Sequence, residues 1–245
     1  MSLRITFATA FRILTQLRHD RRTIALILLI PAVLLTLLRY VMDSSPATFD
    51  YIGLTMLGVF PFISMFLVTS VAMLRERTSG TLERMLTTPV HKLDLIVGYG
   101  LAFSIAAALQ SAVATGVAYW LLDLTTRGAA WLVILIAIAN AVLGMALGLF
   151  VSAFANSEFQ AVQFMPAVVL PQILLCGLIW PRDEMVGWLQ GIARVLPLTY
   201  AVEALTEVGA HADPTAVLWR DLGIVAGCAV AALMLGALTL RRRTG

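Results

Sequence analysis

Charged side chains are scarce in this sequence. Only 13% of its 245 residues are charged and 60% are apolar, whereas soluble domains carry about 25% charged residues. The mean hydropathy is +0.91, and several windows of about 20 residues hold almost no charge, the length that an α-helix needs to cross a bilayer. These apolar runs are continuous rather than alternating, which excludes a membrane β-barrel. The sequence therefore predicts an all-α polytopic membrane protein.

The motifs of several enzyme classes are also absent from the sequence. It contains no G-x-x-x-x-G-K-[ST] phosphate loop, so we expect no ATP hydrolysis by this chain. It contains neither H-E-x-x-H nor G-x-S-x-G, so we expect neither of these two common hydrolase active sites. The two cysteines fall in apolar segments and the three histidines in three separate polar segments, so we expect no disulfide and no metal site. We expect no bound cofactor and no nucleic-acid partner.

Acidic residues are missing from the middle of the apolar segments. The nearest ones, Asp123, Glu158 and Asp221, lie at segment ends. Ion-coupled carriers usually need an ionisable or ion-ligating residue at membrane depth. This pattern disfavours an ion-coupled secondary carrier, which stays a less favoured alternative.

The N-terminal residues 1–22 predict a helix in the membrane surface. Leu3, Phe7, Ala10, Leu14 and Leu17 recur at helical spacing, while polar residues lie mostly on the opposite face. Arginines interrupt the apolar residues and no small-residue cleavage site follows, so this segment is neither a membrane span nor a signal peptide.

Six membrane spans follow along the chain. We predict them at residues 23–40, 51–74, 95–122, 129–154, 159–180 and 218–240, with prolines inside the first, second and fifth. Only three polar residues, 156–158, connect the fourth and fifth. The whole chain, residues 1–245, is expected to form a single transmembrane domain.

The distribution of basic residues predicts the orientation of the spans. Twelve lie in the N-terminal segment, the stretch 75–94 and the C-terminal tail, and five lie on the other side. We expect the protein in the plasma membrane. The positive-inside rule then places both termini and this stretch on the cytoplasmic side. All five tryptophans then fall on or near the outer side, as an interfacial aromatic belt would.

Residues 181–217 form the one sizeable outer segment. Apolar residues at helical spacing precede Pro197, and a second such pattern begins near Tyr200. We predict two short amphipathic helices, too short to span, that dip into the outer leaflet in a re-entrant manner or cap the bundle.

The stretch 75–94, RERTSGTLERMLTTPVHKLD, is the longest polar run between two apolar segments. The pairs Glu76/Glu83 and Arg77/Arg84 are seven residues apart, which on one helix would put each pair on one face. Ser79-Gly80 predicts a break, followed by a short helix from about residue 81 that Pro89 ends. The stretch is either a solvated loop or a structured helix that another protein binds.

The run R-E-R-x-S-G-T-L-E-R-M-L-T-T-P at residues 75–89 resembles the signature of ATP-binding-cassette exporter permeases of the daunorubicin-resistance and polysaccharide-export class. Its core elements here are Glu76, Gly80, Thr81, Glu83 and Pro89. The N-terminal helix, the six spans, the tight link after the fourth span and the Leu-Pro-Leu-Thr-Tyr element at residues 196–200 extend the resemblance over nearly the whole chain.

The resemblance implies that the stretch after the second span is a coupling helix docking on a separate cytoplasmic ATPase. The complex would hold two ATPase copies, which bind ATP and Mg, and a second permease subunit as a homodimer or heterodimer. The first and fifth spans would form the dimer seam, and the chain length favours the half-size type. The coupling residues implied are Arg75, Glu76, Arg77, Gly80, Thr81, Leu82, Glu83, Arg84 and Pro89.

The substrate class follows from the apolar spans and the resemblance together. We expect the protein to export a hydrophobic or amphiphilic drug or lipid. We also expect membrane lipid to contact the protein itself. Apolar side chains of the second and fifth spans either line its path or face lipid: Met56, Phe60, Phe62, Phe164 and Met165. The alternative function is a membrane-embedded assembly or anchoring subunit without transport.

Overall fold

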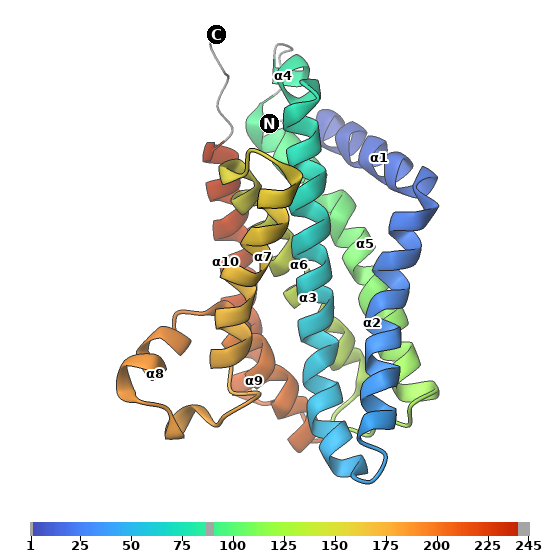
Figure 1. Cartoon of the computed structure of the whole chain (residues 1–245), viewed down its shortest axis with the longest axis vertical. Helices are drawn as coiled ribbons and strands as arrows, with labels where there is room; N and C mark the ends of the chain where they lie inside the picture. Colours follow the sequence, from blue (N-terminus) through green and yellow to red (C-terminus); the bar gives the residue numbers. More distant parts are fainter. Residues whose placement is uncertain (1, 87–90, 240–245) are drawn as a thin grey trace.

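The computed structural model describes residues 2–86 and 91–239, and helices dominate them (Figure 1). In order these are α1 (Leu3–His19), α2 (Arg21–Val41), α3 (Pro46–Thr78), α4 (Thr81–Leu86), α5 (Lys92–Trp120), α6 (Ala130–Val151), α7 (Glu158–Leu175), α8 (Gly187–Ala193), α9 (Pro197–Ala210) and α10 (Ala216–Thr239), with short 3-10 turns at Ser152–Phe154 and Arg182–Glu184. No strand occurs within the described ranges. The predicted all-α fold is confirmed.

Six of these helices are long and apolar enough to cross a membrane, namely α2, α3, α5, α6, α7 and α10. They coincide with the six predicted spans, with two differences in length. The second is longer than predicted and reaches Thr78. The fifth is shorter: it ends at Leu175 rather than at residue 180, because Gly177 two positions later has φ +93 and leaves the helical conformation.

The helices α3 and α6 form the centre of the bundle. In their most apolar windows 61% and 67% of residues are buried, against 17% in both α2 and α7. Gly144 and Gly148 allow the close approach, because a Cβ atom at either position would lie within 2.4 Å of a backbone carbonyl oxygen of α3. The helices α2 and α7 are therefore peripheral within this subunit.

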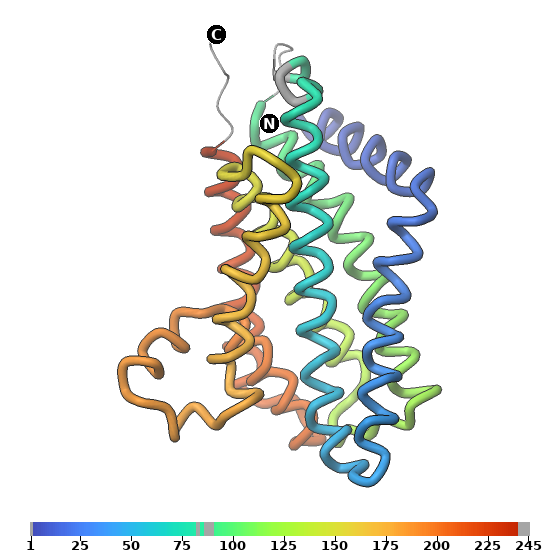
Figure 2. The backbone as a smooth tube through the Cα atoms, viewed as in Figure 1, coloured from blue at the N-terminus to red at the C-terminus, as the bar shows by residue number. Residues whose placement is uncertain are grey.

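One end of the bundle carries α1 and α4, and the opposite end carries α8 and α9 (Figure 1). Figure 2 shows α1 running across the bundle and turning sharply into α2. The N-terminal helix is thus present as predicted, but its apolar stripe is divided. Ala10 is buried, while Leu3 and Phe7 are 69% and 63% exposed, so only the later part of the stripe packs on the bundle.

The segment between α7 and α10 contains two short helices, α8 and α9, in the region where two were predicted. Pro197 starts α9 at its first position, where a missing N–H costs nothing. Glu203 of α9 accepts hydrogen bonds from Arg182 (2.9 Å) and from Arg220 of α10 (3.3 Å). These ion pairs attach the segment to the end of the bundle opposite α4.

Candidate functional site

The candidate site is the end of the bundle where α1, α4 and the adjoining ends of α3, α5 and α7 meet (Figure 1). The break between α3 and α4 is built by Ser79 and Gly80. Gly80 has φ +71, a conformation that costs a residue with a Cβ atom about 1–2 kcal/mol. The side-chain hydroxyls of Ser79 and Thr81 lie 3.0 Å apart across the turn. The predicted break and the start of the short helix at Thr81 are confirmed.

The break changes how the charged residues of this stretch are arranged. Glu76 and Arg77 belong to the last turn of α3, whereas residues 83 and 84 belong to α4. The predicted break separates the two members of each pair seven residues apart, because the left-handed Gly80 interrupts the helix between them. The first charges of the stretch therefore sit on a long central helix and not on the short one.

Glu76 is held inside the subunit by α1 and α5. Arg12 of α1 donates from Nη1 to Glu76 Oε1 (3.2 Å) and from Nη2 to the Tyr99 hydroxyl of α5 (2.7 Å). The Arg12 guanidinium also lies 5.9 Å from the centroid of the Tyr99 ring, within reach of a cation–π contact. The Glu76 side chain is only 12% exposed. This cluster joins three helices at the end that carries α4.

Arg75 makes a second contact between helices. Its Nε and Nη2 donate to the two carboxylate oxygens of Glu158 at 2.8 and 3.1 Å. This bidentate geometry is the strongest form of the arginine–carboxylate pair. Both side chains are more than half exposed, so solvent screens the pair. It connects the end of α3 to the start of α7.

The remaining residues of the predicted coupling set differ in what surrounds them. Arg77 has its Nε and Nη2 atoms buried without a hydrogen-bond partner among the described residues. Arg84 is exposed on α4. Leu82 and Glu83 lie within α4 by their backbone, and the predicted stop at Pro89 falls outside the described residues.

The start of α1 is attached to the start of α5 by a buried carboxylate. Asp94 accepts hydrogen bonds from the backbone N–H of Ser2 at 3.0 and 3.2 Å, and the Thr6 hydroxyl lies 3.5 Å from Asp94 Oδ1. Asp94 is fully buried. This contact fixes the start of α1 to the start of α5.

Sequence reasoning missed four residues of this end: Arg12, Asp94, Tyr99 and Glu158. The pattern of α1 puts its polar residues, Arg12 among them, mostly opposite the apolar stripe, yet Arg12 contacts Glu76. An arginine beside the buried face of an amphipathic helix is the one available signal, because its long side chain can reach a carboxylate on a neighbouring element. Nothing in the sequence pairs it with a residue 64 positions away.

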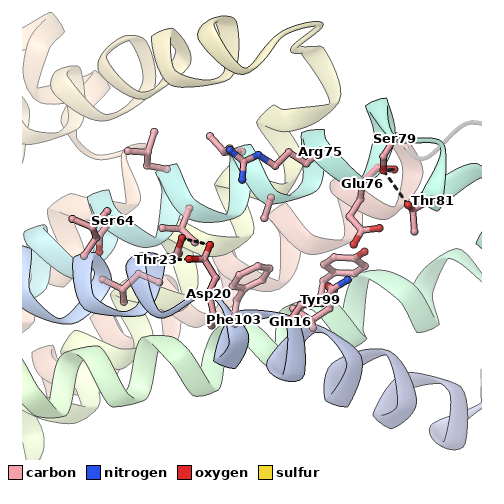
Figure 3. A pocket seen from close by; sticks show the side chains of 18 of the residues that line it. Gln16, Asp20, Thr23, Ser64, Arg75, Glu76, Ser79, Thr81, Tyr99 and Phe103 are labelled. Atoms are coloured by element: carbon pink, nitrogen blue, oxygen red, sulfur yellow. Dashed lines mark hydrogen bonds between the residues drawn. The ribbon is translucent and has the colours of Figure 1, made fainter.

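A cleft of about 580 Å³ opens beside the Arg12–Glu76 contact, between α1, α2, α3 and α5. Figure 3 shows Glu76 and Tyr99 pointing toward each other at one side of it and Ser64 at the other side, with Asp20 and Thr23 between them. The hydroxyl of Ser64, which lines the cleft, accepts a hydrogen bond from the Gln110 side chain of α5.

The five predicted path residues lie elsewhere. Phe62 is fully buried in a cluster with α6, α7 and α9 residues. Met56, Phe60, Phe164 and Met165 are partly buried against core clusters. None of the five lines the cleft, and their role in a path stays a prediction.

Comparison with known proteins decides the family. The profile described as "ABC-2 type transporter" matches residues 5–208, which is most of the chain and extends from within α1 to within α9. The chain belongs to the ABC-2 type transporter family. The identification as a membrane-spanning permease of the ATP-binding-cassette class is therefore confirmed, and the protein is an integral membrane protein.

Several curated proteins resemble this ABC-2 chain over about two thirds of its length. It is 26% identical over 159 residues to ABC transporter G family member 20 of Dictyostelium discoideum, covering 65% of this chain and 22% of that protein. It is 22% identical over 168 residues to the probable multidrug ABC transporter permease YbhR of Escherichia coli (strain K12), covering 69% and 46%. It is 25% identical over 168 residues to the linearmycin resistance permease protein LnrN of Bacillus subtilis (strain 168), covering 69% and 43%. The matched region thus spans less than half of each of these relatives.

Proposed function

We propose that this chain is the membrane subunit of an ATP-driven exporter and that a separate ATPase docks on the end formed by α1, α4 and the adjoining end of α3. The observation that carries the proposal is α4: a short helix in an ABC-2 chain that connects α3 directly to α5. The chain has no phosphate loop, so ATP and Mg are bound by the partner. No catalytic residue is assigned to the permease.

The contacts at this end give a route for movement into the spans. A displacement of α4 acts on α3, which is one of the two most buried spans. Arg12 ties α3 to α1 and α5, and Arg75 ties it to α7. Rigid helices joined by such pairs move together, which allows a change in the ATPase to alter the packing of several spans.

The cytoplasmic side is assigned from charge. The twelve basic residues of one side include those of α1 and of the end of α3, and the five of the other side include Arg182 and Arg220. The positive-inside rule supports a cytoplasmic α1 and α4. Trp120 at the end of α5 and Trp131 at the start of α6 then lie at the outer interface, where tryptophan is enriched.

A second permease subunit is proposed to cover α2 and α7. Both helices are mostly exposed in this subunit. Gln163 of α7 is exposed, and an amide that faces hydrocarbon without a partner is unfavourable. Burial of Gln163 at a subunit contact relieves that cost. Whether the partner is a second copy of this chain is decided by purifying the complex and identifying its subunits.

The cargo is proposed to be hydrophobic or amphiphilic, such as a drug or a lipid. The spans lack acids at mid-depth, and two of the relatives carry the printed names multidrug permease and linearmycin resistance permease. The experiment is reconstitution of the permease with its ATPase in proteoliposomes, followed by ATP-dependent movement of a fluorescent amphiphilic dye. Dye movement that stops without ATP supports the exporter. Stable association without movement of any amphiphile favours the anchoring subunit instead.

A further inference from the structure

The cleft between α2 and α3 is polar in one part and apolar in the other. Asp20 and Glu76 contribute carboxylates to its wall, whereas Leu67 and Phe103 contribute apolar surface (Figure 3). On α3 the lining runs from Ser64 to Ser79, which is about 22 Å of helix at ~1.5 Å per residue. Its volume of about 580 Å³ falls within the range of ~300–1,000 Å³ usual for small-molecule sites. The shape is that of a slot along the helix, with charge near the end that carries α4.

Two carboxylates and the Arg75 guanidinium line the cleft, so its charge is net negative. Glu76 Oε1 accepts from Arg12, while Glu76 Oε2 is buried with no hydrogen-bond partner of good geometry among the described residues, although the Tyr99 hydroxyl faces the carboxylate. Leaving a buried carboxylate oxygen unpaired is costly. Arg75 also borders the cleft, but its guanidinium is bonded on two atoms to Glu158. A donor that enters the cleft therefore meets an acceptor that is already desolvated.

Asp20 adds a second carboxylate, with the Arg75 guanidinium nearby but not in direct contact with it. It caps α2 by accepting from the Thr23 backbone N–H (3.1 Å) and hydroxyl (2.6 Å). No ion pair to Asp20 occurs in the part of the chain that the structure describes. Together with Glu76 it gives the polar part of the cleft a preference for a cation that can donate a hydrogen bond.

We infer that this cleft is a binding site for a single-chain amphiphile with a primary ammonium head. The head donates to Glu76 Oε2 in the field of Asp20, and the chain lies between α2 and α3 along Leu67 and Val71. The site is intrasubunit and lies beside the start of α4, since Ser79 and Thr81 also line the cleft. Binding of the amphiphile needs no ATPase. The inference therefore rests on the proposed function only where it identifies the bound amphiphile as the exported cargo.

The test is photo-crosslinking of the full-length permease alone in nanodiscs of zwitterionic phospholipid. The probe is a long-chain primary alkylammonium with a diazirine at the end of its chain. Two further probes share the chain and carry a trimethylammonium or a sulfate head. Mass spectrometry locates the labelled residues. We expect labelling on Ile30, Leu67 and their neighbours by the primary ammonium, about tenfold less by the trimethylammonium, which has no N–H, and only background by the sulfate.

Variants separate the cleft from the lipid-facing surface. Val71→Trp fills the apolar part and should abolish labelling there, whereas Val230→Trp on an exposed face of α10 should leave it unchanged. Asp20→Asn keeps the helix cap, since asparagine caps as well as aspartate, but should reduce the preference for ammonium over sulfate. Glu76→Gln should remove the preference for primary ammonium over trimethylammonium.

Three outcomes overturn the inference. They are equal labelling by the sulfate probe, labelling that Val71→Trp does not change, and displacement of the probe by an excess of a two-chain phosphatidylethanolamine, which would make the cleft a membrane-lipid site. Failure of transport in proteoliposomes with this labelling intact would instead refute the proposed function and leave the binding site standing.

Discussion

Arg12 of α1 and Glu76 of α3 are 64 residues apart in sequence, and their Nη1 and Oε1 atoms lie 3.2 Å apart. The pair closes a contact between the helix across the end of the bundle and one of its two most buried spans. Because Glu76 is 12% exposed and Arg12 is 32% exposed, the pair is partly shielded from water. This ion pair connects α1 directly to α3.

Removing Arg12 should destabilise the subunit. Arg12→Ala leaves the Glu76 carboxylate and the Tyr99 hydroxyl without their donor, and an unsatisfied buried group costs about 1–3 kcal/mol. Thermal unfolding of the purified permease measures the loss. The double variant Arg12→Ala/Glu76→Gln should lose less than the sum of the single changes, because the two residues interact. Arg18→Ala, on the exposed end of α1, is the control, and strict additivity of the two changes would contradict the contact.

The Arg75–Glu158 pair should behave differently although its geometry is better. Both side chains are more than half exposed, and exposed pairs contribute about 0.2–1 kcal/mol. We expect Arg75→Ala to lower the unfolding temperature by less than Arg12→Ala does in the same assay. A larger effect of Arg75→Ala would mean that α7 is held at this end more firmly than the exposure of the pair indicates.

Gly80 should tolerate asparagine better than valine. Its φ of +71 suits glycine and is accessible to asparagine, but a β-branched residue is strained there. No atom lies within 4 Å of a Cβ placed at Gly80, so the effect is one of backbone conformation and not of space. We expect Gly80→Val, unlike Gly80→Asn, to displace α4 and reduce stimulation of the partner ATPase. Gly187→Val, at an equally open position with an ordinary φ, should have no effect, and a normal Gly80→Val protein would exclude a precise role for the turn.

The sequence was sufficient for the bundle but not for the contacts at its end. Continuous apolar runs determine six helical spans, because a helix satisfies its own polar backbone groups in lipid while its apolar side chains face hydrocarbon. The break at Gly80 could also be predicted from the sequence, because glycine adopts a positive φ without strain. The Arg12–Glu76 and Asp94–Ser2 contacts were not, because they depend on how α1 crosses the bundle, which no local pattern specifies.

The proposed orientation can be tested by cysteine labelling in intact cells. In a variant without Cys176 and Cys228, single cysteines at Ala8 and Ser79 should be protected from a membrane-impermeant thiol reagent, and one at Ala212 should react. All three positions are exposed on the subunit, so protection reports the membrane and not burial. Labelling of Ser79 from outside would reverse the assignment of sides.

Docking of the ATPase on α4 is tested by charge reversal at Glu83, a residue of α4. A surface substitution costs within about 0.5 kcal/mol, whereas opposing like charges at an interface costs several kcal/mol. The measurement is the amount of ATPase that co-purifies with Glu83→Arg, compared with Glu184→Arg at the opposite end of the bundle, where Glu184 is exposed. We predict an inserted, folded Glu83→Arg permease that retains little ATPase, while Glu184→Arg retains the wild-type amount. Wild-type retention by Glu83→Arg, with normal transport, would contradict docking at α4 and make this segment a solvated loop.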